Sequence, residues 1–251
     1  MEAQGSRNEA FSPARGEDWV LLLEQGGAPD ASHVLREAIG AVQRGPQLTT
    51  LRVQFARLGR LVPQRALASC AYSDGLAGAR NAAFFTADHV ARVSLVVASA
   101  SVLPAAELPG AITTLYRTGS DREQQSVLRA LPWLPEPRRF VELASEACRT
   151  NDVSVFAALC SDNPFPAEHM PDGAFFQMVM KAMFLGVSHE HTLGLAGRVT
   201  PELLRMISDY ENERRAAGRS VPDDISRIRR MASPAAATTT TTTPLSEEPS
   251  R

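Results

Sequence analysis

Apolar residues recur at intervals of three and four along most of this chain, which is the spacing of one face of an α-helix. Leu48, Leu51, Phe55 and Leu58 form one such stripe, and Pro63 ends it. We find no convincing run of alternating β-branched residues of the kind that a half-buried strand needs. The sequence therefore predicts an all-α fold.

Helix start and stop signals divide the pattern into about ten helices. Ser120 and Glu123 form a capping box, Thr200 is placed to cap a helix, and Gly218 follows the end of that helix. The expected helices cover about 17–25, 31–43, 46–61, 86–103, 105–116, 120–131, 137–150, 153–160, 174–185, 200–218 and 222–230.

The segment Asn163 to Pro166 interrupts this series, because each of its two prolines fixes its own φ and biases the preceding residue away from helix. We expect a rigid, extended elbow at this point. The side chain of Asn163 should bond to the backbone of its own loop, as asparagines in turns do.

Short connections between the helices suggest antiparallel hairpins, arranged as an irregular array of the HEAT or armadillo type and curled into one compact domain. The prolines that end helices show no strict period. We expect this domain to span residues 17–231. Residues 1–16 and the Ala/Thr/Pro-rich residues 232–251 have the composition of disordered tails.

The charge and the cysteines exclude several classes of protein. The formal net charge of −2 gives no field that would attract nucleic acid. The cysteines Cys70, Cys148 and Cys160 match no disulfide or zinc spacing, so they are typical of small core residues in a reducing compartment.

No apolar run is long enough to span a bilayer, and no secretory signal opens the chain. We expect a soluble, cytoplasmic protein.

Familiar catalytic and cofactor motifs are missing. The sequence holds no phosphate-binding loop, dinucleotide fingerprint, nucleophile elbow or H-E-x-x-H zinc motif, so it predicts no cofactor and no metal. His189 and His191 are two residues apart, so they could share a metal only outside a helix, and exposed residues of a loop or helix start are the simpler interpretation. Glu168 and His169 could act as an acid–base pair, although exposed loop residues would look the same.

Lys181 is the most informative polar residue. It is the one lysine among 26 basic residues, and it lies in an apolar helix in which Gln177, one turn earlier, is the other polar side chain. A buried ammonium needs a carboxylate or a set of carbonyls. Lys181 is therefore either a structural ion pair, a lysine that reaches the surface, or a residue that binds an anion or hydroxyl in a pocket.

Several blocks of this sequence match the pattern of a known family. They are Arg149 to Asn151, Asn163 to Pro166, Gln177 with Met178, Lys181 and Phe184, Pro201 to Leu203, and Glu213 to Arg219, with weaker matches at Asp88, Ala91, Arg92 and 128–135. With these blocks the chain resembles the EboA proteins of a bacterial secondary-metabolite gene cluster. It departs from the family pattern at Phe175 and Phe176, where a tryptophan and an asparagine commonly precede the glutamine.

The resemblance implies a bacterial protein that works with other proteins of the same cluster to make or export a cyclitol-like or lipid-linked metabolite. An enzymatic activity does not follow from the resemblance. A non-catalytic helical scaffold or metabolite-binding accessory protein is one hypothesis. The alternative is an enzyme without a familiar motif, which would act on a small metabolite through a pocket around Lys181. Lys181, Gln177, Asn163, Glu168 and His169 are the candidate site residues in both cases.

Overall fold

The computed structural model describes residues 16–67 and 86–232, and every α-helix in it was expected from the sequence except the short one at Phe165–His169. The described residues contain no strand, only an isolated bridge between Ala66 and Thr86. The all-α prediction is confirmed. The tails predicted to be disordered lie almost entirely outside the described residues, as does Cys70.

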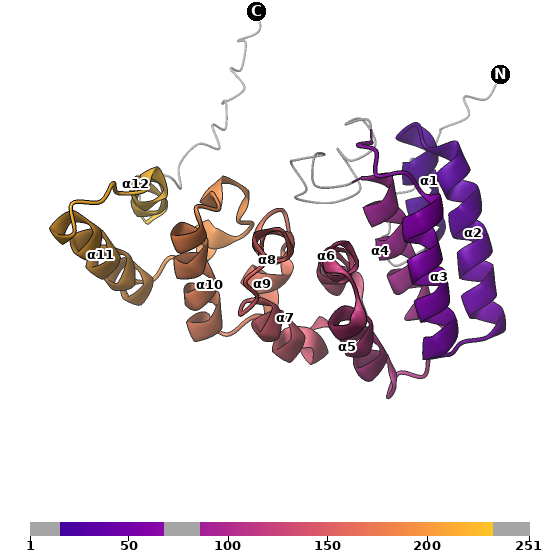
Figure 1. Ribbon diagram of the computed structural model, residues 1–251. Helices are drawn as coiled ribbons and strands as arrows, with labels where there is room; N and C mark the ends of the chain where they lie inside the picture. Colours follow the sequence, from indigo (N-terminus) through magenta and orange to yellow (C-terminus); the bar gives the residue numbers. More distant parts are fainter. Residues whose placement is uncertain (1–15, 68–85, 233–251) are drawn as a thin grey trace, which may run out of the picture. The chain divides into compact units, whose positions relative to one another are not determined.

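The described chain falls into two compact units, which meet in sequence between Gly194 and Leu195. The α-helices of the first unit are α1 Gly16–Gln25, α2 Pro29–Arg44, α3 Leu48–Leu61, α4 Ala87–Ser99, α5 Leu108–Thr118, α6 Asp121–Ala130, α7 Val141–Ala147, α8 Val153–Cys160, α9 Phe165–His169 and α10 Asp172–Leu185 (Figure 1). Those of the second unit are α11 Pro201–Ala216 and α12 Asp223–Met231.

Helix α4 lies at the centre of the first unit, where α1, α2, α3 and α6 all pack against it. Its apolar residues, among them Val90, Val93 and Val96, are fully buried. Farther along the chain α6 packs on α8, and α8 packs on α10. Helix α4 is apolar on most sides, so it is stable only with other helices packed around it, since an exposed face would leave apolar surface in water.

Capping follows the sequence closely. The predicted box at the start of α6 is present, with the Glu123 carboxylate accepting from the Ser120 backbone N–H at 2.9 Å. The Thr200 hydroxyl accepts from the Leu203 N–H at 3.3 Å at the start of α11, and Gly218 beyond its end has a φ of 65°. These contacts satisfy backbone groups that helix ends leave unpaired.

The expected extended elbow is wrong. Pro164 has helical dihedrals, with φ −75° and ψ −19°, and the short helix α9 begins at Phe165. Proline is compatible with the first turn of a helix because its missing N–H has no partner there. The prediction for Asn163 is confirmed, since its side-chain oxygen accepts from the Phe165 N–H at 3.0 Å.

The irregular array of HEAT or armadillo type expected from the sequence is not confirmed. The α-helices range from 5 residues in α9 to 16 in α2, and 3₁₀ turns interrupt the series at Leu131–Trp133, Pro137–Phe140, His189–His191 and Leu195–Arg198. In the described residues no helix has the length and apolar character needed to cross a membrane.

Gly59 allows a charged side chain to pass between α3 and α4. A Cβ at this position would overlap the guanidinium of Arg92, which is 5% exposed and lies over the Phe55 ring at 5.8 Å. In a helix interior, alanine is normally better than glycine by up to about 1 kcal/mol. At Gly59 the overlap with Arg92 should instead make the alanine variant less stable than the glycine chain.

We predict that Gly59→Ala lowers the free energy of unfolding by about 1–3 kcal/mol, the usual cost of overpacking. Gly110→Ala is the matched control in α5, because a Cβ there meets nothing within 4 Å. It should be neutral or stabilising. Urea denaturation followed by circular dichroism measures both, and a stabilising Gly59→Ala would show that Arg92 has no fixed position.

Candidate functional site

Lys181 lies in the middle of α10 and reaches the carboxyl end of α7. Its ammonium donates to the backbone oxygens of Cys148 and Thr150 at 2.7 and 2.6 Å, and it lies 5.3 Å from the centre of the Phe156 ring. The side chain is half-buried. A cation in this position satisfies carbonyls that the helix leaves unpaired and interacts favourably with the helix dipole.

The sequence also predicts an acidic partner for Lys181, and the nearest candidates by segment are Asp162, Glu168, Asp172 and Asp209. This prediction is wrong, because among the described residues no acid forms an ion pair with Lys181. Asp209 pairs instead with Arg205 at 3.2 Å. The physical reason is that the end of α7 already offers two carbonyl oxygens, which can hold an ammonium without burying a second charge.

Lys181 and Gln177, which their spacing places on one face of α10, line the same cavity. This hollow of about 480 Å³, called the Lys181 cavity below, lies between the end of α7 and α10. Its volume falls in the range typical of small-molecule sites. The lining residues are Ser145, Cys148, Arg149, Met170, Ala174, Gln177 and Lys181.

The lining of the Lys181 cavity carries two positive charges and no carboxylate. Arg149 is exposed at its rim, and Ser145 and Gln177 add a hydroxyl and an amide. Burial, the largest cause, raises the pKa of the Cys148 thiol to about 12, so this group is neutral at pH 7. An ammonium has three N–H groups, and two of those of Lys181 go to carbonyls, which leaves one for a ligand.

The other three candidate residues do not line the Lys181 cavity. Asn163 is buried, and its amide donates to the backbone oxygens of Leu128 and Ala158 at 3.0 and 3.1 Å. These bonds tie α6 to α8, which is a structural function. Glu168 is exposed, and its carboxylate lies 3.6 Å from the ring of His169.

His189 is not the exposed residue expected from the sequence. It is 1% exposed, and its ring nitrogens lie 3.0 Å from the Thr192 hydroxyl and 3.0 Å from the backbone oxygen of Val179. A carbonyl oxygen can only accept, so Nε2 donates to Val179, and together with the contact to Thr192 this bond holds the ring in place. No group of three or more His, Cys, Asp or Glu in the described residues could hold a metal.

Sequence reasoning missed a buried charge network at the start of α4. Asp88 is fully buried, and its carboxylate accepts from Arg92 at 2.8 Å and from Arg122 of α6 at 2.8 Å. The Thr86 hydroxyl donates to it at 2.5 Å. The available signal was Asp88 with Arg92, an acid and a base one turn apart in a helix whose other residues are mostly apolar.

Burial alone would raise the pKa of Asp88, but the hydrogen bonds from Thr86 and Arg122 outweigh it and hold this pKa below its usual value. His89 behaves in the opposite way. Burial, helped by the nearby positive charge of Arg129, lowers its pKa to about 4, so the ring is neutral at pH 7. The network thus consists of one carboxylate held ionised beside one histidine held neutral.

His89 should make stability depend on pH. Its pKa is about 4 in the folded state and about 6.5 in the unfolded state, so the unfolded chain takes up a proton first as the pH falls. The free energy of unfolding should therefore be unaffected by this group above pH 6.5 and should decrease as the pH falls from 6.5 towards 4. Asp88, Arg92, Arg122 and Arg129 surround it, and because the pKa of Asp88 is lowered, any contribution of that carboxylate falls at the acid end of this window. We predict a slope of up to about 1.4 kcal/mol per pH unit across this window.

Urea denaturation at half-unit pH steps measures this slope, and His89→Gln should reduce it because the substituted side chain does not titrate. His33→Gln is the control, since the His33 side chain is 75% exposed. A slope that survives His89→Gln unchanged would assign the pH dependence to other groups.

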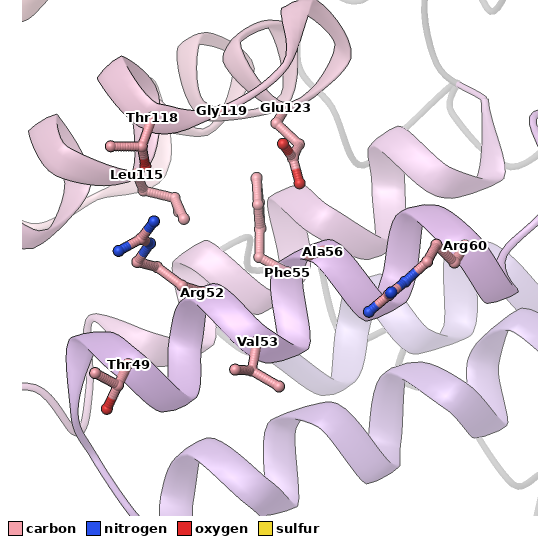
Figure 2. Close-up of a pocket in the computed structure, with 10 residues that line it drawn as sticks. All are labelled: Thr49, Arg52, Val53, Phe55, Ala56, Arg60, Leu115, Thr118, Gly119 and Glu123. Atoms are coloured by element: carbon pink, nitrogen blue, oxygen red, sulfur yellow. The ribbon is translucent and has the colours of Figure 1, made fainter.

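A second cavity, of about 420 Å³, lies between α3 and the turn that joins α5 to α6 (Figure 2). We call it the Phe55 cavity. Figure 2 shows the side chains of Arg52 and Phe55 rising from α3 towards Leu115 and Glu123 on the opposite wall. Like the Lys181 cavity, it lies within the first unit.

Comparison with known proteins gives one match. The model of a family described as "Metabolite traffic protein EboA" matches residues 22–229. No curated protein and no solved structure matches the chain.

Proposed function

The chain belongs to the EboA family, described as metabolite traffic proteins, and on this premise we propose that it binds a small polar metabolite in the Lys181 cavity without transforming it. It would hold this metabolite for the enzymes or exporter encoded in the same gene cluster. The partners proposed are therefore other proteins of that cluster and one small molecule.

The observation that carries the proposal is the lining of the Lys181 cavity. Lys181 and Arg149 supply positive charge, while Ser145 and Gln177 supply groups that both donate and accept hydrogen bonds. Such a set favours a metabolite with hydroxyl or oxyanion groups. Of the described residues that line it, none is a carboxylate or an imidazole, and this favours binding over acid–base catalysis.

The test is native mass spectrometry of the full chain purified from its own bacterial host. We expect one retained small molecule per chain. Arg149→Gln should lower its occupancy by at least tenfold, because a charge-assisted hydrogen bond is lost from an otherwise intact cavity. Arg44→Gln removes the same charge from exposed Arg44 at the end of α2 and should leave occupancy unchanged. A chain that retains nothing, or equal loss in both variants, would contradict the proposal.

A further inference from the structure

The Phe55 cavity has a composition that differs from that of the Lys181 cavity. Its middle is apolar, with Phe55, Ala56 and Leu115 in the lining. Phe55 is 1% exposed, and on the other side its ring is covered by the Arg92 guanidinium at 5.8 Å. Because Asp88 holds Arg92 at 2.8 Å, the ring is a fixed floor rather than a side chain free to fill the hollow.

Charge in the Phe55 cavity is placed unevenly. Arg52 extends into it beside Leu115 and Thr118 (Figure 2), and this guanidinium forms no ion pair or hydrogen bond with any described residue. Two arginines of the same helices differ, since Arg57 of α3 pairs with Glu37 at 2.6 Å and Arg117 of α5 pairs with Glu146 at 2.6 Å. A planar group with five N–H donors is therefore available at one end.

The opposite end carries Glu123, whose carboxylate is already held by the Ser120 backbone N–H at 2.9 Å and the Ser120 hydroxyl at 3.1 Å. Arg60 also lines the cavity, so the lining carries two arginines and one carboxylate, and this balance suits a ligand with one negative charge. At the Arg52 end, the Thr118 hydroxyl donates to the Thr114 backbone oxygen at 2.9 Å, so its lone pairs remain for a ligand donor.

We propose that the Phe55 cavity is a second binding site, specific for a small organic monoanion with an apolar body. Arg52 binds the carboxylate or sulfonate group, and the body lies on Phe55 and Leu115. Ala56 leaves the room that the body occupies. The site is independent of the Lys181 cavity and of the function proposed for it.

The probe for this site is 8-anilinonaphthalene-1-sulfonate, a monoanion with an aromatic body whose fluorescence rises when it leaves water. Titration of the full chain should show one saturable site that Ala56→Leu removes and that Arg52→Gln weakens at least tenfold. N-phenyl-1-naphthylamine, which has a similar body and no sulfonate, should bind at least tenfold more weakly than the sulfonate. Inorganic phosphate at millimolar concentration should not displace the probe, because it has no apolar body.

Two variants serve as controls, Arg44→Gln for the loss of charge and Ala174→Leu for a filled Lys181 cavity. Both should leave this probe site unchanged. The proposal is overturned if Ala56→Leu and Arg52→Gln bind the probe as the unchanged chain does, or if Ala174→Leu removes the site instead. Circular dichroism on each variant establishes that the helices are retained, and because Arg52 is exposed, Arg52→Gln remains decisive even if Ala56→Leu unfolds.

Discussion

Asp88→Ala should lower the free energy of unfolding by about 3–5 kcal/mol. The substitution leaves Arg92, which is 5% exposed, without the carboxylate that holds it at 2.8 Å, and it removes the acceptor for Arg122 as well. A buried guanidinium without its partner keeps the full cost of leaving water. Urea denaturation at pH 7 measures the loss.

Glu146→Ala is the matched control, since it breaks an arginine–carboxylate pair of similar geometry on the surface. Arg117 lies 2.6 Å from Glu146, but its side chain is 61% exposed. Exposed pairs contribute about 0–1 kcal/mol. If the two substitutions cost the same, the Asp88 network does not have the central structural role that its burial indicates.

Lys181→Met should cost about 3 kcal/mol, because two charge-assisted hydrogen bonds of about 1.5–3 kcal/mol each are lost and the side chain is only half-buried. Methionine keeps the unbranched apolar stem, so the loss belongs to the ammonium. The same urea denaturation measures it.

Arg149→Gln is the control in the same cavity, and it should change the free energy of unfolding by less than about 0.5 kcal/mol, as surface substitutions do. A cost below 1 kcal/mol for Lys181→Met would mean that the carbonyls of Cys148 and Thr150 find other partners. The two variants together separate the structural contribution of Lys181 from the binding contribution of the cavity.

The sequence predicted the helices well because their signals are local. The capping residues Ser120 and Thr200 and the glycine at 218 act within one turn of the chain, so their effect can be read without knowing the fold. At the double proline the local signal was ambiguous, because proline fits both an extended segment and the first turn of a helix. Tertiary packing selects the helix, because α9 places Phe165 fully buried in the core.

The candidate site could be predicted only in part. The spacing of Gln177 and Lys181 placed both on one face of a helix, and both line one cavity. The acceptors of Lys181 could not be found from the sequence, since every residue has a carbonyl and only the fold brings those of Cys148 and Thr150 to the ammonium. The same holds for Arg122, which reaches Asp88 across 34 residues of sequence.

The proposed function is tested most directly by filling the Lys181 cavity without touching its hydrogen bonds. Ala174→Leu does this, because Ala174 lines the cavity and makes no side-chain hydrogen bond. Ala56→Leu, which fills the Phe55 cavity, is the matched control. Native mass spectrometry of chains purified from the host should show the retained metabolite in the control and at least tenfold less of it in Ala174→Leu. Equal retention by the two variants would contradict binding in the Lys181 cavity.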